Sequence, residues 1–361
     1  MSQLRKQKLA LSTAAMTMAL MLGNSAYAQR AEPDNGRPNP YRAVEGWAKL
    51  PDGRTWGSTA GVDIDPDGTH VWAIDRCGAN SCAGSSLDPI LKFDSSGNVV
   101  TSFGAGLFNF PHGIHVDRDG NVWVTDARGP NGTDPNMDGK GHVVIKLSPQ
   151  GEVLMTLGTP GVSGNGPYSF DQPCDVVTAP NGDIFVADGH GGQNRNAPPE
   201  TTARIVKFSA DGTFIREWGK LGSAEGEFRT PHALAIDPQG RLVVGDRGND
   251  RLQMFDLDGN FIEQWTQFSR PSGIHFGPDG LIYVADSESN RPANDHWGWE
   301  IGIRAGSLED GVVTALIGGS NPEGVAVDAA GNVYGAVVSF GGNLIKHERL
   351  QRTDLHSQEP Q

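Results

Sequence analysis

Several features that would place this chain in other classes of protein are scarce. The 361 residues include only 3 cysteines, and 29 Lys and Arg stand against 43 Asp and Glu, for a formal net charge of −14. This acidic balance, with no basic stripe, argues against nucleic acid and anionic membranes as partners. The one long apolar run, at 9–22, is too short and too rich in Ala and Thr for a spanning helix, so we expect no membrane insertion.

The first 28 residues are typical of an export signal. Arg5, Lys6 and Lys8 precede the apolar run, and small residues end the segment at Ala28. We therefore expect cleavage near Ala28 and a periplasmic or secreted protein. Loss of three basic residues would make the chain still more acidic, which favours solubility and cation binding.

Two of the three cysteines lie close together. Cys77 and Cys82 stand in a predicted loop, and in an oxidising compartment we expect them to form a disulfide. Their spacing could also suit a metal, but no second Cys/His pair is nearby. We interpret the third, Cys174, as a buried small apolar residue rather than a nucleophile.

Glycine and proline, in contrast, are abundant, with 49 and 23 residues, which indicates many tight turns rather than helices. A pattern of apolar strand, Asp-x-x-Gly-like turn and second apolar strand recurs six times, at 61–68, 113–120, 175–182, 233–240, 273–280 and 324–331. Two further strands follow most copies. Four short antiparallel strands in repeats of about 40 to 60 residues describe a propeller blade. We predict an all-β, six-bladed β-propeller over 29–348, followed by a disordered tail over 349–361.

The two ends of the predicted propeller complement each other. The last repeat offers three strands, whereas 44–50 resembles a strand without a partner. We expect 44–50 to complete the last blade, because pairing there removes an open sheet edge. An extended β-solenoid is the alternative, but the variable repeat length and the unpaired strand count against it.

The residue before the first strand of each blade, its start residue, should lie near one mouth of the central channel. The six start residues read Ala60, His112, Cys174, His232, Ser272 and Glu323. A preceding proline directs most of them, and His112, His232 and Glu323 come from alternate blades. Two imidazoles and a carboxylate predict a divalent-metal site with an open position. Alternatively, the Pro-His pairs only mark where a repeat begins, and the histidines cap turns.

The repeats resemble NHL repeats, and the chain resembles peptidyl-α-hydroxyglycine α-amidating lyase over nearly the whole propeller. The resemblance rests on the strings at 111–114, 231–234, 245–247, 187–190 and 203–208. It implies a six-bladed propeller that binds zinc and cleaves the C–N bond of a peptidyl-α-hydroxyglycine, releasing a peptide amide and glyoxylate.

Carried over residue by residue, the resemblance implies roles for six side chains. His112 and His232 match two zinc ligands, and Glu323 stands where the family has a third histidine. Arg76 and Arg247 match the arginines of blades one and four, and His190 takes the place of the catalytic tyrosine. We expect the metal to polarise a substrate oxygen, the arginines to pair with a substrate carboxylate and His190 to move the proton.

Calcium is a second candidate ion. The loop at 134–140 begins like an oxygen-rich calcium loop, but Ile145 stands where a closing glutamate would be. The family's structural calcium loses its aspartate to Gly324 here. Strand alternation predicts that His115 and His275 point away from His112 and either pack or form hydrogen bonds at blade interfaces. His347 is expected in a solvated tail, and 191–202 in a lid or plain loop.

Two other functions fit the pattern. NHL propellers also serve as non-catalytic modules that bind a protein or glycan partner on one face, and the loop with Trp297 and Trp299 could do this. A gluconolactonase-like hydrolase is the third, although such enzymes hold their metal with Glu, Asn and Asp. We expect a monomer that takes a small-molecule or peptide substrate.

Overall fold

A computed structural model describes residues 33–290, 298–339 and 341–350. The predicted export signal, most of the predicted tail and Trp297 lie outside these ranges. No α-helix is assigned within them, and the helical content is three short 3-10 turns, η1 (Pro135–Met137), η2 (His190–Gln193) and η3 (Arg247–Asn249). No helix of the described residues is long and apolar enough to cross a membrane.

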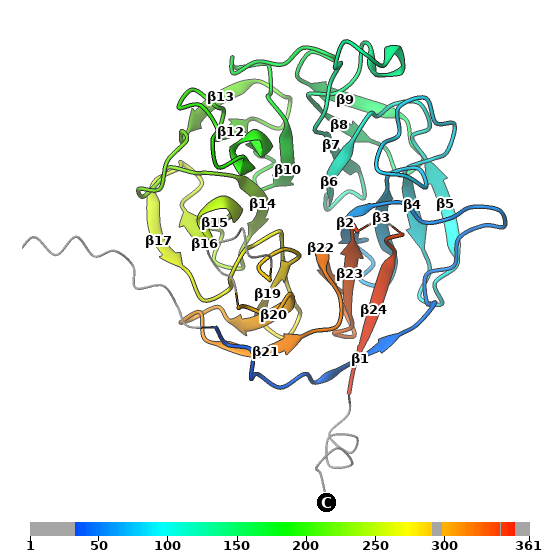
Figure 1. Cartoon of the computed structure of the whole chain (residues 1–361), viewed down its shortest axis with the longest axis vertical. Coiled ribbons are helices and arrows are strands. Elements are labelled where there is room, and N and C mark those ends of the chain that lie inside the picture. The colour runs from blue at the N-terminus through cyan, green and yellow to red at the C-terminus, as the bar shows by residue number, and fades with distance from the viewer. Residues whose placement is uncertain (1–32, 291–297, 340, 351–361) are drawn as a thin grey trace, which may run out of the picture. The chain divides into compact units, whose positions relative to one another are not determined.

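Six four-stranded antiparallel sheets surround a central axis, which confirms the predicted six-bladed propeller (Figure 1). Blades one to three comprise β2 (Thr59–Ile64), β3 (Val71–Asp75), β4 (Ile90–Phe93) and β5 (Val99–Phe103); β6 (Pro111–Val116), β7 (Val122–Asp126), β8 (Val143–Leu147) and β9 (Val153–Leu157); and β10 (Pro173–Thr178), β11 (Ile184–Asp188), β12 (Arg204–Phe208) and β13 (Phe214–Trp218). Blades four and five comprise β14 (Pro231–Ile236), β15 (Leu242–Asp246), β16 (Arg251–Phe255) and β17 (Phe261–Trp265); and β18 (Gly273–Phe276), β19 (Leu281–Asp286), β20 (Gly302–Ser307) and β21 (Val313–Ile317).

The last blade joins the two ends of the chain. Its strands are β22 (Pro322–Val327), β23 (Val333–Val337), β24 (Leu344–Arg349) and β1 (Tyr41–Val44), in the order β1-β24-β23-β22. An N-terminal strand therefore does complete this blade, but the strand is 41–44 and not the predicted 44–50. Trp47 made 44–50 look strand-like, yet this indole packs between blades against Phe93 and Tyr334 instead.

Each turn between the first two strands of a blade is held by its own side chains. In blade two, Asp117 accepts hydrogen bonds from the backbone of Asp119 and Asn121, and its other oxygen accepts the indole N–H of Trp123. The repeated Asp-x-x-Gly pattern thus builds both the turn and an anchor for a large strand residue. Trp123 is 2% exposed, so the turn also orders the core.

A second repeated aspartate, at the end of the second strand, positions the start residues. Asp126 accepts backbone N–H groups from Asn109 and Phe110, and Asp246 accepts those of Arg229 and Thr230. These donors lie just before the strands that begin at Pro111 and Pro231. The carboxylates therefore fix the path of the chain into the channel-lining strands.

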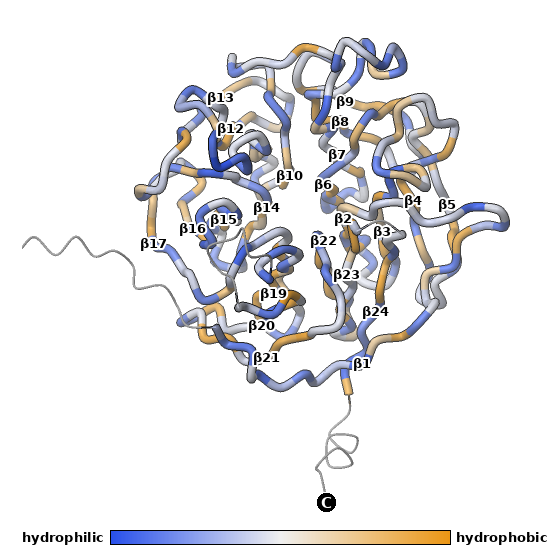
Figure 2. Tube along the Cα trace, viewed as in Figure 1, coloured by the Kyte–Doolittle hydropathy of each residue, from blue (hydrophilic) through white to orange (hydrophobic). Residues whose placement is uncertain are grey.

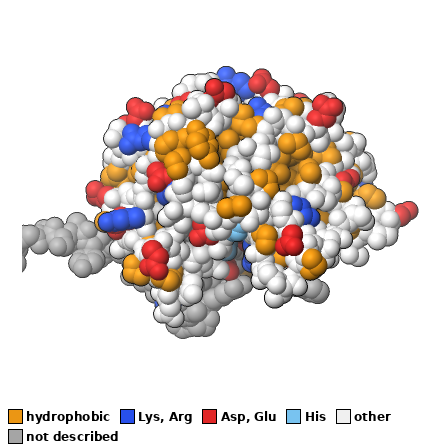
Figure 3. Space-filling view, turned by 90° about the horizontal axis from the view of Figure 1, so that it is seen from above, with side chains coloured by type: hydrophobic (Ala, Val, Ile, Leu, Met, Phe, Trp, Pro, Cys, Tyr) orange, Lys and Arg blue, Asp and Glu red, His pale blue; other side chains and the backbone are white. Residues whose placement is uncertain are grey.

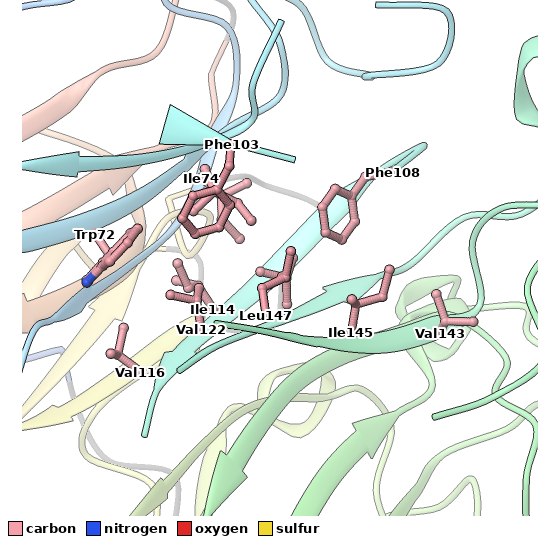
Figure 4. Packing of buried hydrophobic residues seen from close by; sticks show 12 residues of the cluster. Trp72, Ile74, Phe103, Phe108, Ile114, Val116, Val122, Val143, Ile145 and Leu147 are labelled. Carbon is pink, nitrogen blue, oxygen red and sulfur yellow. The ribbon is translucent and has the colours of Figure 1, made fainter. Parts of the chain in front are cut away.

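Apolar side chains fill the space between neighbouring blades. Hydrophobic colour follows the strands in Figure 2, and Figure 4 shows Trp72 and Ile74 of blade one facing Ile114, Val122 and other residues of blade two. Burial of such side chains contributes about 1.5 to 3 kcal/mol each, which holds the blades side by side.

The predictions for single residues outside the channel have mixed outcomes. The Cys77–Cys82 disulfide is confirmed, and Cys174 is free and fully buried. The placement of His347 in a solvated tail is wrong, because this residue lies in β24 and is 3% exposed. The sequence beyond it is polar, which hid the strand.

Candidate metal centre at the channel mouth

Three imidazoles from three blades converge near the axis. His112 and His232 are start residues in β6 and β14, and His190 begins η2 in blade three. One ring nitrogen of each lies within 4.8 Å of the others, so these residues could hold a metal ion. The predicted convergence of His112 and His232 is therefore observed, and His190 joins them.

Close backbone approach explains how His112 is aimed. Its Nδ1 lies 2.9 Å from the carbonyl oxygen of Cys174 in the next blade, and a Cβ on Gly113 would lie 2.5 Å from that same oxygen. Only glycine at 113 lets β6 come this near to β10. His232 is held in the same way, with Nδ1 2.8 Å from the carbonyl oxygen of Ser272.

The carbonyl contacts leave the other ring nitrogens free. Because Nδ1 donates to a carbonyl, Nε2 of each ring carries the lone pair. Nε2 of His112 and Nε2 of His232 are buried and have no hydrogen-bond partner. This is the arrangement that metal-binding histidines adopt, with one nitrogen oriented by a backbone carbonyl and the other aimed at the ion.

Glu323 of β22 faces both free nitrogens. Its Oε1 lies 3.3 Å from Nε2 of His112 and 3.5 Å from Nε2 of His232. Glu323 is itself buried, so its carboxylate meets the two imidazole nitrogens away from solvent. A carboxylate anion and two imidazole lone pairs thus share one small space, as the sequence predicted.

The three imidazoles are neutral at physiological pH. Burial lowers the pKa of His112, and burial together with the nearby Arg247 lowers that of His232 to about 3. The same two causes, in that order, hold the pKa of His190 well below its ordinary value. Neutral imidazole is the form that binds metals, so the site needs no deprotonation of histidine before loading.

Glycine also directs His190. Gly189 has a φ of 141°, and a Cβ there would lie 2.3 Å from the carbonyl oxygen of Thr202. The chain therefore turns sharply after β11 and brings His190 over the mouth. Nε2 of His190 lies 3.3 Å from Nη2 of Arg247, which also donates to Gln193. Hence 190–193, at the start of the predicted lid or loop, forms part of the site.

Two buried arginines border the imidazoles. Arg76 is 4% exposed and donates from Nε to the carbonyl of Pro111 and from Nη1 to Oδ1 of Asn80. Arg247 is 2% exposed and contacts His190. Burial lowers the pKa of Arg76 to about 10, and Glu323 opposes this effect. Both side chains remain cationic at neutral pH and favour an anionic ligand.

The prediction for His115 and His275 is confirmed in part: His115 does hydrogen-bond between blades, but neither residue lies apart from the channel. Both line the same central cavity of about 260 Å³ as His112, His232 and Glu323. A β-bulge between Pro111 and Ile114 resets the alternation of side chains, so counting from His112 misplaced His115. His115 does hydrogen-bond between blades, with Nε2 2.8 Å from Oγ1 of Thr178.

Sequence reasoning did not single out several channel residues. Asp63 lies 3.4 Å from Nδ1 of His115, and its Oδ2 accepts the backbone N–H of Val116. Asp175 similarly accepts the N–H of Leu234 in blade four. These aspartates link neighbouring blades inside the channel. Their only signal in the sequence was an acidic residue within an otherwise apolar strand.

The loop predicted as a calcium candidate has a local structural role. Asp134 caps η1, where its Oδ1 accepts the backbone N–H of Asn136. Calcium binding by 134–140 stays a prediction.

Trp299, which the sequence suggested for partner binding, is 3% exposed.

Comparison with known proteins agrees with the repeat pattern. A model described as NHL repeat matches residues 108–131, 228–255 and 268–291. Peptidyl-glycine alpha-amidating monooxygenase A of Xenopus laevis is 31% identical, over 84% of this chain and 34% of its own length. A protein named probable peptidyl-alpha-hydroxyglycine alpha-amidating lyase pgal-1, of Caenorhabditis elegans, is 35% identical, over 44% of this chain and 40% of its own length.

A third relative has no activity in its name. NHL repeat-containing protein 3 of Homo sapiens is 32% identical, over 68% of this chain and 66% of its own length. The chain thus spans about a third to two thirds of the length of these three relatives. Among solved structures, a streptogramin B lyase covers 85% of this chain and 97% of its own, with a TM-score of 0.53 and 18% identity. This likeness shows the fold alone.

Proposed function

Because the chain is a six-bladed NHL-repeat β-propeller similar to the peptidyl-α-hydroxyglycine α-amidating lyases, we propose that it is a metal-dependent lyase. Its substrate would carry an α-hydroxyglycine-like group, bound at the channel mouth. The observation that carries the proposal is the pair of buried, unpartnered Nε2 atoms of His112 and His232 facing the Glu323 carboxylate. The disulfide supports an exported location for this activity.

The donor set fits zinc. Zinc binds imidazole nitrogen and carboxylate oxygen. Oε1 of Glu323 lies 3.3 and 3.5 Å from the two Nε2 atoms, so the three donors are close enough to hold one ion. We assign His112, His232 and Glu323 as ligands. A divalent ion held there would supply Lewis-acid polarisation of a substrate oxygen.

Arg76 and Arg247 would bind the substrate carboxylate. Nε and Nη1 of Arg76 are engaged by Pro111 and Asn80, which fixes the plane of the guanidinium and leaves Nη2 toward a ligand. Arg247 approaches from blade four through its contact with His190. Both are buried, so a carboxylate between them would form strong charge-assisted hydrogen bonds.

His190 would move the proton. In the reaction the substrate hydroxyl loses its proton and its C–O bond becomes the aldehyde of glyoxylate, while the C–N bond breaks and the amide nitrogen gains a proton. A neutral imidazole can accept the first proton and return it to nitrogen, so no atom is left over. Its low pKa, caused by burial and Arg247, keeps His190 in the accepting form.

The test combines metal analysis with turnover. Replacement of His112 and His232 together by Ala should remove bound zinc, measured by elemental analysis, and abolish glyoxylate release from an acyl-α-hydroxyglycine. His70→Ala is the matched control, because His70 lies in the turn between β2 and β3 and pairs with Asp67. Full metal content in the double variant would contradict the proposal.

The second candidate function is a non-catalytic propeller that binds a protein or glycan partner. The similarity to NHL repeat-containing protein 3 favours it, as do the apolar side chains exposed near β9 and β13, among them Val153, Leu154 and Tyr168. Figure 3 shows hydrophobic side chains gathered over this edge. A pure protein that binds no zinc and releases no glyoxylate would select this function.

A further inference from the structure

Phe110, two residues before His112, carries an arginine on each face of its ring. The guanidinium carbon of Arg76 lies 3.6 Å from the ring centroid, and that of Arg128 lies 3.7 Å from it. Two guanidinium groups this near to one centroid cannot share a face, so the ring is sandwiched between them. Arg76 and Phe110 are buried and Arg128 is exposed, which makes Arg128 the outer layer of the stack.

The guanidinium of Arg128 has N–H groups that can still donate hydrogen bonds. Among residues 33–290, 298–339 and 341–350, no side chain or carbonyl accepts a hydrogen bond from the Arg128 guanidinium, and its contact is with the ring. Stacking fixes the plane of the group but leaves its N–H edge open. A planar guanidinium held in this way is suited to bind a carboxylate through two parallel hydrogen bonds.

The charges around the stack favour an anion. The nearby carboxylate of Asp126 is occupied, because its two oxygens accept the backbone N–H groups of Asn109 and Phe110. Glu323 faces the imidazoles on the metal side. Arg76 and Arg247 together would pair with one substrate carboxylate, which leaves Arg128 as an additional cation on the same side of blade two.

The position of the stack indicates which part of a substrate reaches it. The rings of Phe110 and His112 are 6.2 Å apart between centroids, and Arg128 covers Phe110 from the solvent side. A substrate with its α-hydroxyglycine at the metal centre would therefore extend past Phe110 with its preceding residue.

We propose that Arg128 is a specificity-determining residue that binds an acidic side chain next to the α-hydroxyglycine of the substrate. The preferred substrates are thus acyl-peptides in which glutamate or aspartate precedes the reacting residue. This inference rests on the proposed lyase function for the orientation of the substrate, but the anion subsite itself can be measured without turnover.

The test uses unreactive peptides that lack the hydroxyl group. The zinc-loaded protein should bind acetyl-Glu-Gly about tenfold more tightly than acetyl-Gln-Gly by calorimetry, the gain expected for one charge-assisted pair. Arg128→Gln should bring the two affinities to within about twofold. Arg118→Gln is the matched control, because Arg118 lies at the opposite end of blade two and donates to the carbonyl of Pro180. Equal affinities in the unaltered protein, or a preference that survives Arg128→Gln, would overturn the inference.

Turnover separates this inference from the proposed function. The α-hydroxyglycine forms of the two peptides should release glyoxylate with a kcat/KM ratio that follows the binding ratio. An Arg128-dependent binding preference without glyoxylate release would reject the lyase and keep the subsite. Release from both peptides at equal kcat/KM, with equal binding, would reject the subsite and keep the lyase.

Discussion

At the scale of single residues, the assignment of roles between His190 and Glu323 decides the chemistry. Three imidazoles lie within reach of one ion, yet Nε2 of His190 faces Arg247 whereas Glu323 faces the two unpartnered nitrogens. Sequence reasoning found His112, His232 and Glu323 because a start residue after proline is aimed reproducibly, whereas His190 came only from the family resemblance. It could not find the carbonyls of Cys174 and Ser272 that orient the imidazoles, since backbone groups have no signature in a sequence.

The first prediction separates a ligand from a proton carrier. Glu323→Ala should lower zinc content well below one ion per chain, because the ion would lose one of its three protein ligands. His190→Ala should keep about one zinc but lower kcat at least 100-fold, as expected for loss of a general base. Elemental analysis and glyoxylate release measure the two effects. Loss of zinc from the His190 variant instead would place that residue among the ligands.

The second prediction concerns Asn80, which lies inside the loop closed by Cys77 and Cys82 and accepts a hydrogen bond from Nη1 of Arg76. Asn80→Ala should raise KM several-fold more than it lowers kcat, because Arg76 loses its orientation toward the substrate carboxylate. Asn80→Asp, which retains an acceptor, should recover much of the loss. Equal effects of both variants on kcat alone would exclude a positioning role.

At the scale of elements, an extra residue within a strand is the hardest feature to predict, although it recurs at the first strand of most blades. The four-strand blades followed from the spacing of turns, whereas the bulge near His112 was hidden because it changes no residue type. The same holds for β24, where a polar sequence, 346–349, belongs to an inner strand that pairs with both β1 and β23. The strands could be predicted from the sequence, but the face of the sheet on which a given side chain lies could not.

The third prediction concerns His347 in β24 and the dependence of stability on pH. Burial lowers the pKa of His347 to about 4, and its Nε2 has no hydrogen-bond partner. A histidine with a depressed folded-state pKa stabilises the fold above its unfolded pKa of about 6.5, and the stabilisation is lost as pH falls toward 4. Unfolding free energy should therefore drop by up to about 3 kcal/mol over this range.

His347→Phe should remove most of that acid sensitivity, because the ring can no longer take up a proton. Thermal unfolding from pH 7 to pH 4 measures the difference between the two proteins. Val153→Ala serves as the comparison, since Val153 is exposed and carries no titratable group. An identical pH profile for the His347 variant would contradict the role of this histidine.

At the scale of the whole molecule, closure of the ring depends on β1. The strand is short, but the Tyr41 hydroxyl lies 2.8 Å from that of Tyr283 in blade five, and the ring packs among Ile303, Ala315 and Val325. The sequence predicted closure by an N-terminal strand without locating it. Few apolar residues stand next to Tyr41 in the sequence, whereas Trp47 has several apolar neighbours.

The fourth prediction is that Tyr41→Ala lowers the free energy of unfolding by about 3 kcal/mol, as expected for a buried aromatic side chain. Arg42→Ala, at the neighbouring and exposed position that pairs with Glu348, should change it by less than about 1 kcal/mol. Chemical denaturation of the two variants measures the contrast. Similar losses in both would mean that pairing of the β1 backbone, and not Tyr41, holds the ring closed.

The pairing of Tyr41 with Arg349 also bears on the order of events during synthesis. The strand made near the beginning can find its partner only after the final blade has left the ribosome. Until then its backbone donors and acceptors stay exposed to other extended segments. Closure of the ring must therefore follow synthesis of the last blade, and whatever keeps the early segment apart in the meantime influences the yield of native molecules.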